Sequence, residues 1–324
     1  MKLGQLKASF IKAGFFLLLG ILALSVAMGQ VHLSESADSH SEQHFGTASL
    51  PLFALAPCVP GTVNRFTGSY HSNLYIGNAN GVNVLLAWGQ NMKTYTTGAG
   101  GDYTAPFFVN TSSYAGIPYE VRSSSTGGGS GPSVMAMRTS TKFYVFGSTT
   151  NISNITSMAN FGAASLTNAN ADVTNKLPAG VGIADVAQFA VSPTAIGIVT
   201  TAGNVYMLTK MQTLQGDNAA AGPAVWHQVT LSNGTPLSGV VKFSLSGSGA
   251  FALTATGKIY YWGRPANVNG TVNTTTSYNY AYDMSAQIPS GTSVVELVVL
   301  GKSTGTNVLF LLCNNLKVYS CGLN

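Results

Sequence analysis

The ionisable and nucleophilic side chains of this sequence are few, and their spacing matches little known chemistry. A zinc site needs three or four His, Cys or acidic ligands, yet only His71 and His227 lie beyond residue 51, and no Cys-x-x-Cys occurs. The Ser-containing stretches SGSGA (246–250) and GGGSGPS (127–133) do not fit a nucleophile elbow, and Gly257-Lys258 lacks the remainder of a phosphate loop. These patterns assign no catalytic residue, no metal ligand and no cofactor.

Paired carboxylates are the remaining route to an enzyme. A glycosidase needs two of them about 5–10 Å apart, and the ten acidic residues are dispersed along the chain. Asp102 and Glu120 are candidates to converge on one face, with Asp283 as a third. The simpler interpretation is that these are solvated charges, so a hydrolytic enzyme is the third hypothesis for function.

The aromatic residues suggest that the protein binds a ligand and does not catalyse a reaction. Tyr278, Tyr280 and Tyr282 alternate in SYNYAYDM (277–284), which places them on one face of an extended strand. Four further aromatics fall in segments that we expect to be inter-strand loops: Tyr103, Phe107, Tyr114 and Tyr119. Such residues on a rigid scaffold suit carbohydrate stacking or protein contact. The alternative for each of them is packing against outer strands.

The elements that would position these side chains form an internal repeat. Five stretches share the order apolar strand, turn, aromatic strand, and each centres on a tyrosine at a period of about 50–60 residues. The tyrosines are Tyr95, Tyr144, Tyr206, Tyr260 and Tyr319. Because a lone hairpin is marginally stable in water, such units must stack. We therefore expect the strands VLLAW (84–88) and VLFLL (308–312) to be buried on both faces.

A second set of apolar strands precedes the hairpins, at 185–193, 239–247 and 293–301, and 224–231 is a candidate for a fourth strand. Four-stranded units arranged around an axis are the blades of a β-propeller. The Gly- and Asn-rich stretch 154–170 is expected to be a loop excursion. The predicted fold is an all-β propeller of repeated hairpins.

Two of the hairpins resemble the repeat of regulator-of-chromosome-condensation propellers. ALTATGKIYYWG (252–263), which includes Trp262, and CNNLKVYSCGLN (313–324) carry this likeness, and the other three units are degenerate. The resemblance implies a propeller of usually seven blades, so five units suggest a propeller that is incomplete at the C-terminus. No motif matches the residues of the family's nucleotide-exchange role, and that activity is not carried over.

The N-terminus predicts export. Lys2, Lys7 and Lys12 precede an apolar stretch with small residues Ala27 and Gly29 ahead of a cleavage point, typical of a bacterial signal peptide over 1–29. An uncleaved signal anchor is the alternative, and this segment is the only membrane contact we expect. Residues 30–51 are predicted to be a polar linker and 52–324 the propeller.

Composition agrees with this location. Only 8% of residues are charged, against about 25% in average globular proteins. Beyond the signal peptide the basic residues are scattered, whereas nucleic-acid binding needs them clustered, so we expect no nucleic-acid partner. Three cysteines remain open to two interpretations, buried free thiols or a Cys58–Cys321 link. Hairpin register places Cys321 opposite Leu309, which argues against a bond to Cys313.

These observations favour a secreted or cell-surface binding module that recognises a surface protein or polysaccharide. The second hypothesis is a structural or adhesive surface protein.

Overall fold

The structure, a computed structural model, describes residues 65–322 with gaps, of which the longest are 91–101, 148–169, 265–276 and 302–306. By its contacts the chain divides into units 1–53 and 54–324, and every described residue belongs to the second. The predicted signal peptide and linker lie outside the described residues. Within the described part, no helix combines the length and apolar character needed to cross a membrane.

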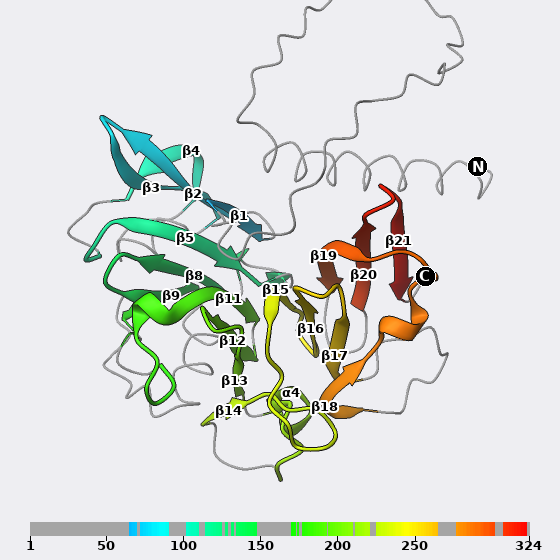
Figure 1. Ribbon diagram of the computed structural model, residues 1–324. Coiled ribbons are helices and arrows are strands. Elements are labelled where there is room, and N and C mark those ends of the chain that lie inside the picture. Colours follow the sequence, from blue (N-terminus) through cyan, green and yellow to red (C-terminus); the bar gives the residue numbers. More distant parts are fainter. Residues whose placement is uncertain are drawn as a thin grey trace, which may run out of the picture. The chain divides into compact units, whose positions relative to one another are not determined.

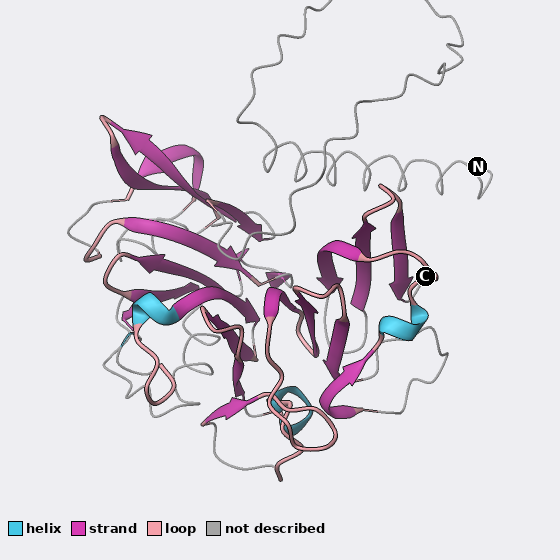
Figure 2. Ribbon diagram, in the orientation of Figure 1, coloured by secondary structure: helices cyan, strands magenta, loops and turns pink. Residues whose placement is uncertain are grey.

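Antiparallel sheets make up nearly all of the regular structure, and they follow one another in chain order (Figures 1 and 2). The first sheet contains β1 (Phe66–Ser69), β2 (Ser72–Ala79), β3 (Val82–Gly89) and β4 (Tyr103–Phe108). The second contains β5 (Pro118–Ser123), β8 (Val134–Thr139), β9 (Phe143–Gly147) and β10 (Asn170–Asp172). The third contains β11 (Val186–Ser192), β12 (Ala195–Thr200), β13 (Val205–Thr209) and β14 (Trp226–Gln228).

The fourth sheet contains β15 (Val240–Leu245), β16 (Gly249–Thr254), β17 (Ile259–Gly263) and β18 (Tyr278–Asp283). The fifth contains β19 (Val294–Gly301), β20 (Asn307–Cys313) and β21 (Val318–Gly322). A small ribbon pairs β6 (Gly127–Gly128) with β7 (Gly131–Pro132), and the short helices are η4 (Ile183–Asp185), α4 (Gln212–Gln215) and η5 (Ser285–Gln287).

The inner strand of each sheet contacts the inner strand of the next, from β1 to β5, β11, β15 and β19. Sheets stacked face to face about their inner strands are the blades of a propeller, so the predicted fold class is confirmed. The three strands that were predicted ahead of the hairpins are β11, β15 and β19, and 224–231 does supply a fourth strand, β14. The predicted loop excursion 154–170 lies almost entirely outside the described residues.

The first hairpin differs from the sequence-based expectation. The reversal between β2 and β3 is at Asn80-Gly81, where both residues have positive φ, 52° and 83°, as a two-residue hairpin turn requires. The strand 84–88 is therefore the third strand of its sheet, not the first strand of a hairpin leading to Tyr95. Tyr95 itself lies outside the described residues.

Burial also differs between the middle and the end sheets. Every residue of β12 and of β16 is buried, because neighbouring sheets cover both faces. In 84–88 and 308–312, buried residues alternate with half-exposed ones. The prediction that these two strands are buried on both faces is wrong, since no described strand covers the outer face of the first or the fifth sheet.

Polar side chains link consecutive sheets near the start of their inner strands. A β-bulge precedes Glu120, Gln188, Lys242 and Glu296 in β5, β11, β15 and β19. The Gln188 amide donates to the Val241 carbonyl and accepts from the Phe243 N–H at 3.1 Å. Lys242 Nζ lies 2.9 Å from Glu296 Oε2. We call these contacts the inter-sheet clasps.

The clasp between the second and third sheets uses an arginine. Arg138 lies opposite Glu120 in the register of β5 and β8, and its guanidinium donates to the Val186 carbonyl at the start of β11. A second nitrogen of the same guanidinium lies 3.2 Å from Glu120 Oε2. A side chain therefore ties each sheet from the second to the fourth to the sheet that follows it.

Gln188→Leu tests the clasp between the third and fourth sheets. The substitution leaves a buried N–H and a buried C=O without partners, and each such loss costs about 1–3 kcal/mol. We expect the free energy of unfolding, measured in urea, to fall by about 2–4 kcal/mol. The control is Gln287→Leu at an exposed position, where we expect a change within about 0.5 kcal/mol. Equal effects of the two substitutions would contradict the clasp.

Candidate functional site

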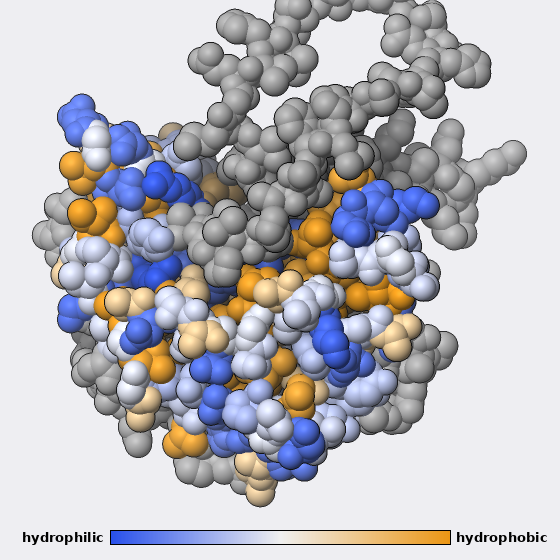
Figure 3. Space-filling model, in the orientation of Figure 1, coloured by the Kyte–Doolittle hydropathy of each residue, from blue (hydrophilic) through white to orange (hydrophobic). Residues whose placement is uncertain are grey.

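The outer face of the first sheet carries one large apolar side chain from each strand. In register, Phe66 lies opposite Tyr75, Tyr75 opposite Leu86, and Leu86 opposite Phe108. Residues directly opposite one another in neighbouring strands share a face, so the four form a continuous strip that we call the aromatic row. Phe66, Tyr75 and Phe108 are 39%, 40% and 66% exposed. Apolar residues are visible at the surface over this sheet and over the fifth (Figure 3).

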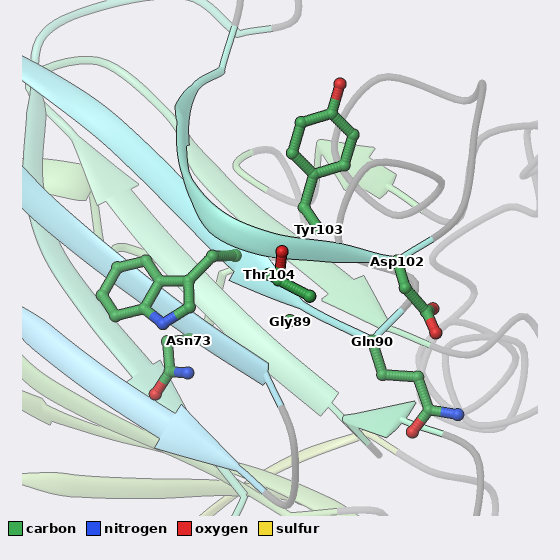
Figure 4. Close-up of a pocket in the computed structure, with 7 residues that line it drawn as sticks. Asn73, Gly89, Gln90, Asp102, Tyr103 and Thr104 are labelled. Atoms are coloured by element: carbon green, nitrogen blue, oxygen red, sulfur yellow. The ribbon is translucent and has the colours of Figure 1, made fainter.

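A hollow adjoins one end of the aromatic row. Trp88, two residues beyond Leu86 on the same strand face, stacks on Phe66 with ring centroids 6.0 Å apart and lies opposite Asn73 in register. The hollow has a volume of about 430 Å³, and its lining residues are Asn73, Trp88, Gly89, Gln90, Asp102, Tyr103 and Thr104 (Figure 4). This volume is in the range of ligand pockets, about 300–1,000 Å³.

The lining combines an aromatic surface with neutral hydrogen-bonding groups. The side chains of Gln90 and Asp102 point to the same side, and Tyr103 points away from them (Figure 4). Amide, hydroxyl and carboxylate groups donate and accept hydrogen bonds, and Asp102 is the one ionisable carboxylate among the lining residues. This arrangement is suited to orienting a ligand, whereas acid–base chemistry on a glycoside needs a second carboxylate beside the first.

The aromatic residues expected in loops lie elsewhere. Tyr103 and Phe107 belong to strand β4, with ring centroids 4.6 Å apart, and Tyr119 belongs to β5. The loop placement of these three is therefore wrong. Tyr103 lines the hollow, Phe107 packs against the cluster between the first two sheets, and Tyr119 lies 4.5 Å beneath the Arg138 guanidinium. Tyr114 is buried in a connecting segment, and desolvation raises the pKa of its hydroxyl.

Tyr278, Tyr280 and Tyr282 lie on β18, where all three are half-buried. The Tyr278 ring is 4.5 Å from Tyr282 and 6.5 Å from Tyr280, measured between centroids, and it also contacts Tyr261 at 6.0 Å. The three rings therefore pack on one another and on the neighbouring strand β17.

The repeat tyrosines occupy equivalent positions. Tyr144, Tyr206, Tyr260 and Tyr319 each pack into the apolar cluster shared with the preceding sheet. Trp262, two residues after Tyr260 on the same strand, is fully buried, and its indole N–H donates to the Leu214 carbonyl at 3.1 Å. In the first sheet, Leu86 takes the position of the repeat tyrosine, and Tyr75 and Phe66 lie beside it on the neighbouring strands.

The three candidate carboxylates belong to three different sheets. Asp102 immediately precedes β4, Glu120 lies in β5, and Asp283 ends β18 beside Lys258, with Oδ2 and Nζ 3.2 Å apart. Glu120 is completely buried, and both of its oxygens are paired, one with Arg122 at 2.9 Å and one with Arg138. Glu120 and Asp283 are therefore each held by basic side chains in different sheets.

Two features escaped the sequence analysis. His227 Nδ1 lies 2.6 Å from Asp217 Oδ2, while the buried Nε2 atom has no hydrogen-bond partner. Within the described residues no three His, Cys, Asp or Glu side chains are grouped to hold a metal.

A Gly-x-Ser-x-Gly pattern also occurs at 301–305, between strands β19 and β20. A nucleophile elbow joins a strand to a helix.

The two described cysteines are not bonded to each other. Cys321 pairs with Leu309 in register, as predicted, and Cys313 is buried. Desolvation raises the pKa of Cys321 from 9.0 to about 11. Cys58 lies outside the described residues.

No protein-family model matches this sequence, and no curated protein matches it either. Solved structures share the fold, human WBSCR16 and yeast RCC1 (Prp20) among them. Human WBSCR16 is 14% identical with a TM-score of 0.52, covering 73% of this chain and 55% of that one. Yeast RCC1 (Prp20), solved with Kap60 bound, is 12% identical with a TM-score of 0.51, covering 91% of this chain and 60% of that one.

The chain thus spans less than two thirds of the length of either structure. At these identities the comparison establishes the fold alone. The propeller implied by the chromosome-condensation repeat is therefore confirmed as the architecture of this chain.

Paired substitutions test whether the aromatic row is uncovered within the folded chain. Phe251 is fully buried on β16, whereas Phe108 is 66% exposed. Phe251→Ala should lower the free energy of unfolding by about 3–5 kcal/mol, and Phe108→Ala should lower it by less than about 1 kcal/mol, as measured in urea. A comparable loss at Phe108 would show that another part of the chain covers the row.

Alkylation tests the environment of Cys321. Because the thiolate is the reactive form and the pKa is raised to about 11, the thiol remains protonated at pH 8. We expect iodoacetamide to label the peptide containing Cys321 slowly in the native protein and rapidly in urea, followed by mass spectrometry. Equal rates in the two conditions would refute the shielded thiol.

Proposed function

We propose that this chain is an exported interaction module that binds a protein at the cell surface through the aromatic row and the adjoining hollow. The observation that carries the proposal is the exposure of Phe66, Tyr75 and Phe108 as one strip across four strands. Contiguous exposed apolar surface on a soluble domain marks an interaction site. The Trp88 hollow adds polar groups at the end of the strip.

A protein partner suits this surface better than a polysaccharide does. Aromatic and aliphatic side chains fill the strip, and the centres of protein interfaces are rich in aromatic residues and poor in charges. No charged residue belongs to the row itself. The likeness to yeast RCC1, whose structure was solved with Kap60 bound, supports a protein-binding role for this scaffold. A sugar would bind mainly through the polar groups that line the hollow and less through the apolar row.

Export is part of the proposal and rests on the charged and apolar segments of residues 1–29. An outer location also suits the low charge content and the Thr-, Ser- and Asn-rich surface. A scaffold of stacked sheets holds the row rigid, so binding needs little ordering of the site.

Binding to intact cells of the producing organism tests this function. We expect the fluorescently labelled mature chain to bind these cells. Protease treatment of the cells should abolish binding, whereas periodate oxidation of surface glycans should leave it unchanged. The reverse pattern would identify a polysaccharide as the ligand and refute the protein proposal.

Variants locate the binding surface in the same assay. The double substitution Tyr75→Ser with Phe108→Ser removes the exposed aromatic rings and should weaken binding at least tenfold. Val225→Ser, at a residue 49% exposed just before β14, is the matched control and should bind as the wild type does. Unchanged binding of the double variant would exclude the aromatic row.

A further inference from the structure

Each seam between sheets is built from two faces of different kinds. In the second to fifth sheets, the row that contains the repeat tyrosine faces the preceding sheet. These rows are Val121–Met137–Tyr144, Phe189–Ile198–Tyr206, Phe243–Ala252–Tyr260 and Leu297–Leu311–Tyr319. Their members belong to the clusters between consecutive sheets. We call this face the leading face of a sheet.

The opposite face of each sheet covers the leading face of the sheet that follows. In the fourth sheet this trailing face includes Phe251, Leu253 and Ile259, which are buried against the fifth sheet. The fifth sheet repeats the pattern, because Phe310 lies opposite Ser320 as Phe251 lies opposite Tyr261, and Leu312 lies opposite Val318 as Leu253 lies opposite Ile259.

Two faces are left uncovered by described strands. The aromatic row is the leading face of the first sheet, where Phe66 is 39% exposed although its equivalent Phe243 is 6% exposed. Phe310, Leu312 and Val318 form the trailing face of the fifth sheet. Val318 is 44% exposed, whereas the equivalent Ile259 is 1% exposed. The described part of the chain therefore presents both halves of a seam, at opposite ends of its series of sheets.

We propose that the partner of the aromatic row is a second copy of this chain, which docks the trailing face of its fifth sheet on the row. This inference rests on the proposed function and names its partner. The two faces are equivalent to the faces that pack together between consecutive sheets of one chain. Both faces are apolar, and the nearest charge on the trailing face, Glu296, is already paired with Lys242.

The docking joins unlike faces and is therefore heterologous. A heterologous contact builds rings where the rotation closes and open chains where it does not. A bound copy uses its row or its trailing face and leaves the other available for the next copy. The average mass of the protein in solution is thus expected to rise with concentration.

Two blocked variants test this arrangement. The row-blocked variant carries Tyr75→Glu and Phe108→Glu, and the trailing-blocked variant carries Phe310→Glu and Val318→Glu. Each retains one docking face but cannot assemble with itself. By light scattering after size exclusion, we expect wild-type oligomers at high concentration, monomers for each variant alone, and particles of twice the monomer mass, with none larger, when the two variants are mixed.

Controls separate docking from misfolding and from the proposed function. Val225→Glu introduces the same charge away from both faces and should assemble as the wild type does, and circular dichroism reports folding. Serine at the same positions replaces any glutamate variant that does not fold. A monomeric wild type at 100 times the concentration used for cell binding, or a mixture that forms no dimer, would overturn the proposal.

Cells that lack the gene distinguish the two proposals. If the partner is a second copy, the amount of labelled chain bound to these cells should be at least tenfold lower than the amount bound to wild-type cells. Undiminished, protease-sensitive binding would overturn the second-copy partner while leaving the interaction module intact. Self-assembly without binding to wild-type cells would overturn the proposed function alone.

Discussion

The packing of each sheet on the apolar face of the next governs this structure. An isolated small sheet is marginally stable, and each seam removes apolar side chains from water at about 25 cal/mol per Å². Apolar contact alone does not fix how two sheets are aligned. The Gln188 and Lys242 clasps add directional contacts at the start of the inner strands, where a bulge re-aims the side chain toward the next sheet.

The same packing explains where recognition is available. Trp262 and Trp88 both precede a glycine with positive φ at the end of the third strand of their sheets. Trp262 is fully buried, with its N–H on the Leu214 carbonyl, whereas Trp88 lines an open hollow beside the aromatic row. A position that is buried in the fourth sheet therefore lines the proposed binding surface in the first, since no described sheet covers it.

The sequence predicted the fold class, four of the five hairpins, and the pairing of Cys321 with Leu309. The first hairpin was misplaced because its aromatic spacing was aligned on Tyr95, although Asn80-Gly81 is a strong local signal for a two-residue reversal. The site was harder to predict. The register that unites Phe66, Tyr75, Leu86 and Phe108 depends on pairing across four strands, and the Asp217–His227 contact joins a helix-flanking loop to β14. Neither follows from local pattern, because both depend on the tertiary arrangement.

The two uncovered faces also constrain how binding and assembly relate. A surface protein that occupies the aromatic row of the terminal copy would prevent further addition at that end, because docking of another copy needs the same side chains. Assembly would continue only through the trailing face of the fifth sheet, at the other end of the series. Under these two proposals, the two unlike faces would couple the length of the assemblies to the supply of partners, without any change in the conformation of a single sheet.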